Sequence, residues 1–215
     1  MKPKMPFYEQ LTHEEKQLFD SNLQLQHYAR GQMIHRHDGN CLGMFCVDTG
    51  RIGVSMLSDE GRQVTLIRLE EGDFCVLAAA CVIRQITFEV SVEAETDTDV
   101  WMLSAQVTSA LMKSNAQFEN FVLRTAMTHF SDVMWTMQQI LFLGYDRRLA
   151  SFLTEECART GGTVLTLTQE QIAKYTGTVR EVVTRMLKRF AAEGYVRLGR
   201  GTVTVLNKNA LRQLV

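Results

Sequence analysis

The chain has 215 residues, of which 46% are hydrophobic, so it is long enough for two small domains with cores of their own. It contains no run of about 18 uncharged apolar residues, and its N-terminal residues lack the apolar segment of a signal peptide. These features predict a cytoplasmic protein without a membrane partner. The five cysteines are odd in number and form no CxxC pair, which excludes a disulfide framework.

The net charge of −1 hides an uneven distribution along the chain. Residues 144–215 hold 12 Lys and Arg against 6 Asp and Glu, whereas the first 143 residues hold 11 against 18. Contact with phosphates requires positive charge only where the contact is made. The last third of the chain therefore predicts a nucleic-acid partner that the overall charge conceals.

The first expected elements are one short helix and a series of strands. Thr12 and Glu15 have the spacing of a capping box and predict a helix that ends near Asp20. Short β-rich runs separated by glycine turns then predict strands at 23–29, 31–35, 43–48, 51–57, 62–69, 74–77, 87–95 and 98–103. Regularly spaced strands of this kind favour a β-barrel or jelly roll.

A long helix is expected next. Ser104 can cap a short helix, and a longer one follows from about Asn115 to Leu143. The long helix carries an a/d heptad seam, formed by Leu123, Met127, Phe130, Met134, Met137 and Leu141. A second apolar face is formed by Phe118, Val122, Val133 and Ile140. Two apolar faces predict two partners, the strand domain and a second subunit in a parallel homodimer. A helix packed only on its own domain is the alternative.

The last third of the chain begins at an expected hinge, Gly144-Tyr145, which is followed by a helix that ends at Gly161-Gly162. Thr168 and Gln171 form another capping box, and Gly177 ends the short helix that they begin. A second helix starts near Val179, with a buried stripe at Val183, Met186, Leu187 and Phe190.

After Gly194, two β-rich runs flank Gly199-Arg200-Gly201 and predict a hairpin. Two helices joined at a glycine and followed by a hairpin are typical of a winged helix-turn-helix. The second helix exposes a charged face of Arg180, Glu181, Thr184, Arg185 and Lys188. Arg can pair with guanine and Glu with the cytosine amino group, so this face suits major-groove readout. A charged face that is simply solvated is the alternative for this helix taken alone.

These segments resemble a known family. QEQIAKYTG, followed by VREVVTRMLKRF and a glycine wing, resembles the DNA-binding domain of the CRP/FNR regulators. The glycines at positions 31, 50, 61 and 72 resemble the β-roll of the same family. The resemblance implies an α+β protein: a double-stranded β-helix (jelly-roll) sensor domain over 1–112, a dimerisation helix over 113–143 and a winged helix-turn-helix over 144–215. It also implies three partners, which are a pseudo-palindromic DNA operator, a second copy of the chain and RNA polymerase.

The resemblance assigns base contacts to Arg180, Glu181 and Arg185, a trio that in the family favours half-sites like TGTGA. Further DNA contacts are expected from Thr168, Gln169, Thr184, Lys188 and Arg200. Val179 departs from the pattern, since relatives often have Ser or Thr there, and a phosphate contact or helix cap is lost with it.

The sensor domain departs from the cyclic-nucleotide pattern. Gly72-Asp73 stands where those relatives have Gly-Glu, and Phe88-Glu89 stands where they have Arg-Ser. A carboxylate at that place repels a phosphate, so the sequence predicts an unidentified small effector rather than cyclic AMP. The expected effector pocket comprises Gly72, Asp73, Phe74, Cys75, Arg84, Phe88, Thr125, Thr128 and His129.

Two other sensing chemistries stay open. Cysteines 41, 46, 75 and 81 lie in the sensor domain and could serve a redox or metal sensor. His35 and His37 have the HxH spacing of a cupin metal site, but Cys41 and Leu42 occupy the place of its glutamate. Haem ligation by His27, His35, His37 or Cys75 has no supporting spacing. The sequence names no cofactor.

Two rival functions follow from the same residues. The first is an effector-binding module whose helix-turn-helix contacts proteins. The second is a cupin-like metal-dependent enzyme, although the sequence has no nucleophile–base constellation and no phosphate-binding glycine loop.

Overall fold

The computed structural model describes residues 5–36, 42–58, 63–77 and 90–215. The chain forms two compact units. The N-terminal unit comprises Met1–Met56 with Leu66–Met134, and the C-terminal unit comprises Leu57–Thr65 with Trp135–Val215. Among the described helices, none has the length and apolar character needed to cross a membrane.

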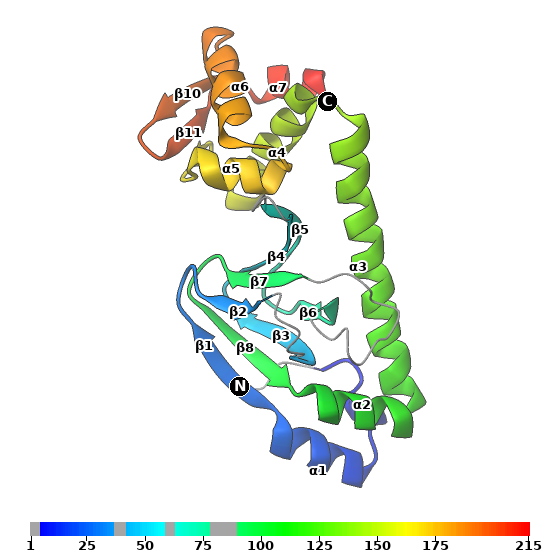
Figure 1. Ribbon diagram of the computed structural model, residues 1–215. Coiled ribbons are helices and arrows are strands. Elements are labelled where there is room, and N and C mark those ends of the chain that lie inside the picture. Colours follow the sequence, from blue (N-terminus) through cyan, green and yellow to red (C-terminus); the bar gives the residue numbers. More distant parts are fainter. Residues whose placement is uncertain (1–4, 37–41, 59–62, 78–89) are drawn as a thin grey trace. The chain divides into compact units, whose positions relative to one another are not determined.

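Two four-stranded antiparallel sheets form the β-sandwich (Figure 1). One has the order β1 (Gln24–Tyr28), β8 (Thr98–Leu103), β3 (Met44–Thr49), β6 (Phe74–Cys75). The other has the order β2 (Met33–His35), β7 (Ser91–Ala94), β4 (Ile52–Leu57), β5 (Gln63–Leu69). Apolar side chains from both sheets, such as Phe45, Val54 and Val92, share one core. The jelly-roll prediction is confirmed. Each predicted strand appears, β8 with the predicted bounds and the others with shifted ends. Residues 62 and 87–89 of the predicted strands lie outside the described residues.

Three helical segments and the start of a fourth cover one sheet through a second core. They are η1 (Tyr8–Gln10), α1 (His13–Asn22), α2 (Ala105–Ser114) and the first turns of α3 (Ala116–Phe142). The predicted capping box is present, with Thr12 Oγ1 accepting from the Glu15 amide. Ser104 caps α2 as expected. Rings gather around Phe7, whose centroid lies 4.7 Å from that of Phe118 and 4.8 Å from that of Phe121.

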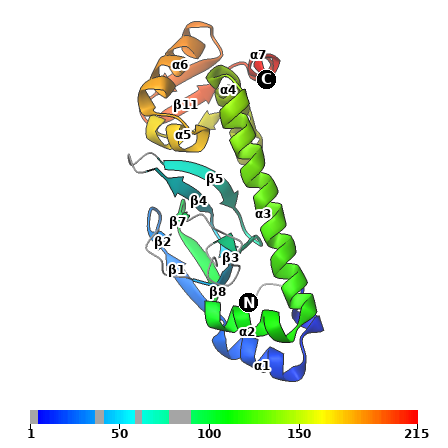
Figure 2. The same cartoon turned by 45° about the vertical axis from the view of Figure 1, so that its right-hand side comes forward.

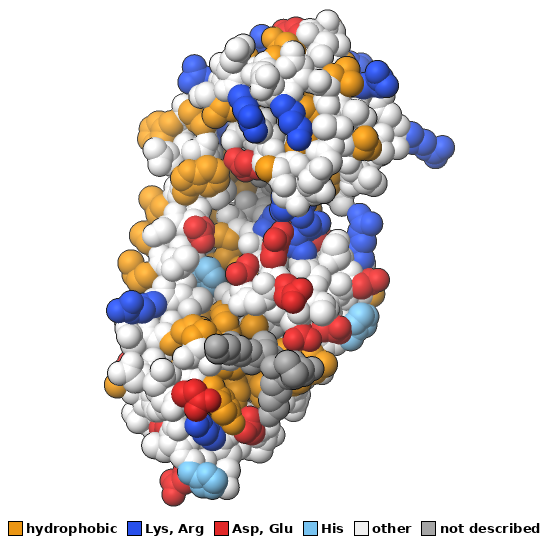
Figure 3. Space-filling model, turned by 180° about the vertical axis from the view of Figure 1, so that it is seen from behind, with side chains coloured by type: hydrophobic (Ala, Val, Ile, Leu, Met, Phe, Trp, Pro, Cys, Tyr) orange, Lys and Arg blue, Asp and Glu red, His pale blue; other side chains and the backbone are white. Residues whose placement is uncertain are grey.

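Helix α3 has the two apolar faces that the sequence predicts. Phe118 and Val122 are fully buried, and Val133 packs against the core of the β-sandwich. The exposed fractions of the heptad seam run from 38% to 66%, at Leu123, Met127, Phe130, Met134, Met137 and Leu141. Figure 3 shows hydrophobic side chains, in orange, along the edge of the molecule on which α3 lies. In one chain, the seam is an uncovered apolar strip.

The C-terminal unit consists of helices around a small three-stranded sheet (Figures 1 and 2). Its sheet has the order β10 (Val196–Gly199), β11 (Thr202–Val205), β9 (Val164–Leu165). The helices are α4 (Tyr145–Thr160), α5 (Gln169–Thr176), α6 (Arg180–Ala192) and α7 (Lys208–Leu214). The hairpin forms where the sequence places it. Neither β9 nor α7 was expected, because two residues of strand and a seven-residue helix carry little periodic signal.

The junction at the expected hinge is bridged by side chains. Arg148 Nη1 on α4 donates to the carbonyl of Ile140, in the last turn of α3, at 2.8 Å, and to that of Leu143, the residue after α3, at 3.1 Å. The Tyr145 hydroxyl shares a 3.2 Å hydrogen bond with Thr176 Oγ1. Hydrogen bonds therefore tie the start of α4 both to the end of α3 and to α5.

Gly43 packs against the backbone at the start of α2, and this close approach gives a test of the fold. Gly43 has φ +91°, and a Cβ there would lie 2.3 Å from the Leu103 carbonyl oxygen. We expect Gly43→Ala to lower the free energy of unfolding by well over 2 kcal/mol, because left-handed strain adds about 1–2 kcal/mol to the clash with a backbone that cannot yield. Gly31→Ala is the matched control, since Gly31 has φ +82° and open space around it. Urea denaturation that shows equal losses would contradict this account.

Candidate nucleic-acid interface and sensor cavity

Local sequence sets the geometry of the helix-turn-helix. Thr168 Oγ1 accepts from the Gln171 amide at 3.1 Å, and Gln171 Oε1 accepts from the Thr168 amide at 2.9 Å, so the predicted capping box is present. Gly177 ends α5 at φ +63°, a left-handed conformation that glycine adopts without strain. Val179 is the N-cap of α6 and makes no side-chain cap hydrogen bond, as its departure from Ser or Thr suggests.

Helix α6 buries one face and exposes the other. Val183, Leu187 and Phe190 are fully buried in the core of the C-terminal unit. The opposite side, here called the recognition face, lines a surface hollow of about 510 Å³ and consists of Arg180, Glu181, Thr184, Arg185 and Lys188. All five residues were predicted from spacing, and the structure brings them together on one surface.

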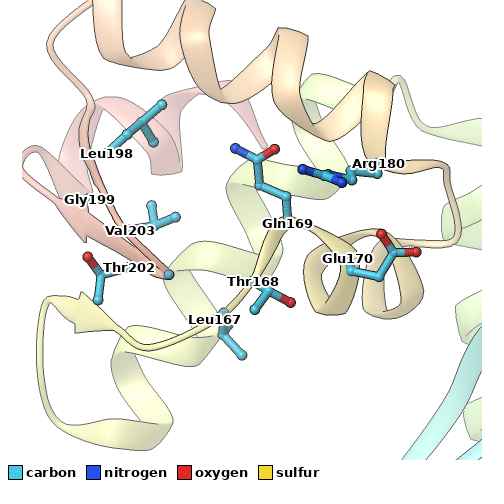
Figure 4. Close-up of a pocket in the computed structure, with 10 residues that line it drawn as sticks. Leu167, Thr168, Gln169, Glu170, Arg180, Leu198, Gly199, Thr202 and Val203 are labelled. Carbon is cyan, nitrogen blue, oxygen red and sulfur yellow. The ribbon is translucent and has the colours of Figure 1, made fainter.

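A second hollow, of about 410 Å³, joins the helix-turn-helix to the wing. Figure 4 shows Thr168, Gln169 and Glu170 at the start of α5 opposite Leu198, Thr202 and Val203 of the hairpin, with Arg180 beside them. Arg200 is exposed at the tip of the same hairpin. The predicted DNA contacts on α5, α6 and the wing thus belong to one compact unit.

One pair of predicted contact residues is bonded internally. Thr184 Oγ1 on α6 lies within hydrogen-bond distance of Gln169 Oε1 on α5 and of the Arg180 carbonyl, at 2.9 Å. This bond ties the first turn of α5 to the recognition face. Spacing alone could not reveal it, because the two side chains lie 15 residues apart.

The N-terminal unit contains a cavity of about 260 Å³, here called the sensor cavity. Six of the predicted effector residues line it: Gly72, Asp73, Phe74, Thr125, Thr128 and His129. Cys75 does not line it but is fully buried in the core of the β-sandwich, because the inward face of β6 packs there. Arg84 and Phe88 lie outside the described residues.

The sequence prediction missed other lining residues, namely Ile67, Arg68, Leu69 and Asp132. Asp132 could have been found, since it lies four residues after Thr128 on the same helical face. Arg68 Nε lies 3.4 Å from Glu95 Oε1, and Arg51 Nε lies 2.7 Å from Glu95 Oε2. The charge of Arg68 is therefore shared with a buried carboxylate.

His129 is the buried polar group of the sensor cavity. Its side chain is 5% exposed, and its Nδ1 has no hydrogen-bond partner among the described residues. Burial lowers the pKa of His129, while Asp132, a hydrogen bond to the Phe74 backbone and Asp73 act against that shift. In the neutral tautomer whose N–H points to the Phe74 backbone, Nδ1 is an acceptor.

The described cysteines are core residues. Cys75 is buried in the core of the β-sandwich and Cys46 in the second core, beneath the helices. Burial raises the pKa of Cys46 to about 12, which opposes formation of a thiolate. Cys41, Cys81 and His37 lie outside the described residues. Within the described ranges, no group of three or more His, Cys, Asp or Glu could hold a metal ion.

Burial of a neutral His129 gives a prediction for acid stability. The folded pKa is depressed below the ordinary 6.5, so the stability that this group contributes is present above pH 6.5 and is lost as pH falls through the folded pKa. The free energy of unfolding should therefore fall less steeply below pH 6.5 in His129→Gln than in the wild type. The difference in slope is at most about 1.4 kcal/mol per pH unit, which is the effect of one proton. Urea denaturation from pH 7.5 to 5 measures it. His13→Gln, at an exposed position on α1, should keep the wild-type slope, and equal slopes in all three proteins would refute the prediction.

Comparison with known proteins agrees with both units. The family model of the Crp-like helix-turn-helix domain matches residues 147–214, and that of the cyclic nucleotide-binding domain matches residues 25–115. The chain is 27% identical over 171 residues to the transcriptional regulator SdrP of Thermus thermophilus, a match that covers 77% of this chain and 80% of SdrP. It is 23% identical over 209 residues to the cyclic AMP receptor protein of the same organism, covering 97% and 96% of the two chains.

A solved structure extends the agreement to the whole chain. A crystal structure assigned to a transcriptional regulator of the CRP/FNR family from Eubacterium rectale superposes with a TM-score of 0.94 and 42% identity. The match covers 98% of this chain and 97% of that one. With its β-sandwich, long helix and winged helix-turn-helix, this protein belongs to the CRP/FNR family of transcription regulators.

Proposed function

We propose that the chain acts as a homodimeric, sequence-specific DNA-binding regulator whose activity is controlled by a small effector in the sensor cavity. The observation that carries the proposal is the recognition face of α6, which exposes two arginines, a glutamate and a lysine on a helix-turn-helix. A solvated charged face needs no wing beside it and no adjoining hollow. This chain has both.

The side chains of the recognition face and its neighbours suit two kinds of DNA contact, to bases and to phosphates. Arg180 and Arg185 offer bidentate donors to guanine, and Glu181 offers an acceptor to the cytosine amino group. Lys188, Thr168 and Arg200 then suit phosphate contacts, which position a protein on DNA without reading sequence. Gln169 and Thr184, bonded to one another, orient α5 against α6 in this proposal.

The seam on α3 supports the homodimer. Its six large apolar side chains are exposed in a single chain, and their 3.5-residue repeat is that of a two-stranded coiled coil. A second copy of α3 has the matching repeat and would cover them. A two-fold dimer of this kind reads a pseudo-palindrome with half-sites about one helical turn apart. The family resemblance adds half-sites like TGTGA and a contact with RNA polymerase.

The position of the sensor cavity supports control by an effector. One wall comes from the β5–β6 region and the other from α3, the helix that carries the seam. A ligand that fits one arrangement of these walls better shifts the population toward that arrangement.

DNA readout can be tested by anisotropy titration of a labelled duplex with two inverted TGTGA half-sites. Arg185→Ala should cost about 1–3 kcal/mol on this operator and reduce discrimination at one base pair. Arg200→Ala should weaken binding to operator and to scrambled DNA alike, with a smaller salt slope. Uniform loss in both variants would remove the readout by Arg185. Binding without steep salt dependence would instead favour a helix-turn-helix that contacts proteins.

The dimer can be tested by changing one seam residue. Phe130→Glu places a charge on the seam, so the variant should sediment as a monomer and bind the operator at least tenfold more weakly. Gln138→Glu adds the same charge at an exposed position of α3 beside the seam and should stay dimeric. A Phe130→Glu protein that keeps the wild-type sedimentation coefficient would show that the seam is not the interface.

A further inference from the structure

We infer that the sensor cavity binds a small organic cation, whose ammonium or guanidinium group donates hydrogen bonds, rather than an anion such as a cyclic nucleotide. The inference rests on the proposed function, in which this cavity is the effector site. It names the chemical class of the effector from the polar groups that line the cavity.

The first group is His129, which is more than nine-tenths buried and lines the cavity. Its imidazole N–H is engaged by the Phe74 backbone, and Nδ1 has no partner among the described residues. A buried acceptor without a partner costs about 1–3 kcal/mol, a penalty that a ligand donor relieves. An anionic oxygen at the same place would instead face the Nδ1 lone pair.

The two threonines present the same polarity. Thr125 Oγ1 donates to the Phe121 carbonyl at 3.0 Å, and Thr128 Oγ1 donates to the Arg124 carbonyl at 3.2 Å. Because each hydroxyl has a single proton, both have only lone pairs left for a ligand. The two hydroxyls on α3 thus act as acceptors in this cavity.

The charged side chains point to the same class of ligand. Asp73 and Asp132 contribute two carboxylates to the lining, against the single cation Arg68. The buried carboxylate of Glu95 pairs with both Arg51 and Arg68, so it offsets the positive charge of Arg68 only in part. The described lining is therefore net negative, which favours a cation and opposes a phosphate.

The size of the cavity and the donor set narrow the ligand further. At about 260 Å³, the cavity is slightly smaller than most ligand pockets, so a compact molecule fits it best. A bare metal ion is disfavoured, since the described residues hold no cluster of three His, Cys, Asp or Glu. A small amine or guanidine can donate to Nδ1 of His129 and pair with the carboxylates.

Calorimetric titration of the full-length protein tests the inference, with putrescine and agmatine as cationic probes and cyclic AMP and succinate as anionic ones. The site is located by NMR of the labelled histidine imidazoles. We expect the amines to bind more tightly than the anions and to shift the His129 signal. The signal of His13, exposed on α1, should stay unchanged.

Matched variants separate the cavity from general charge effects. Asp132→Asn removes a lining carboxylate and should weaken amine binding at least tenfold. Glu119→Gln removes an exposed carboxylate from the same helix, about 20 Å from Asp132 along the helix axis. This variant should leave amine binding unchanged. His129→Gln provides a second lining variant and should also weaken amine binding.

The outcomes separate the two proposals. Amine binding that shifts His129 and is lost in Asp132→Asn supports the inference. Tighter binding of cyclic AMP or succinate, an unshifted His129 signal with both amines, or equal affinity of Asp132→Asn and wild type overturns it. Operator binding is measured on the same preparations without amine. Wild-type protein that fails to bind the operator would count against the proposed function. Wild-type protein that binds the operator but shows no response to either amine would overturn only the ligand class.

Discussion

The packing of Phe7 against α3 is the constraint on which the N-terminal unit depends. Its ring meets those of Phe19, Phe74, Phe118 and Phe121 at centroid distances from 4.7 to 6.4 Å. Edge-on and tilted contacts of this kind stabilise by about 0.5–1.5 kcal/mol each beyond the area that they bury. They fix the first turns of α3 against β6, and this placement also sets the distance between the two walls of the sensor cavity.

One helix thus has three separate tasks, because its faces differ. Phe118 and Val122 belong to the core, Thr125 and His129 line the cavity a turn or two later, and the seam faces outward. A rigid α-helix transmits a displacement along its axis with little loss. Under the proposed function, a change at the cavity wall would reach the seam through the same backbone, without a separate chain of contacts.

Features encoded locally could be predicted from the sequence. The capping boxes at Thr12 and Thr168, the break at Gly177 and the stripe of α6 each depend on residues within a turn or two, and all are present. The strands followed from turn residues between β-rich runs. The family resemblance then supplied the order of the domains.

Features that depend on distant partners could not be predicted. Spacing gave no sign that Gln169 bonds Thr184, that Arg68 shares Glu95 or that Cys75 belongs to the core and not the cavity. The strand β9 exists because β11 offers it a partner, as the pairing of Leu165 with Val203 shows. These contacts arise between segments that only the tertiary fold brings together.

The bridge at Arg148 has a consequence for how the chain could change shape. A rotation of α4 about Gly144 would break two charge-assisted hydrogen bonds to the end of α3, each contributing about 1.5–3 kcal/mol. A signal molecule that favours one orientation tenfold supplies only about 1.4 kcal/mol. Under the proposed function, this joint would resist weakly or poorly matched molecules and would turn only for one with a strong preference. Selectivity would then reside in this threshold as well as in the shape of the cavity.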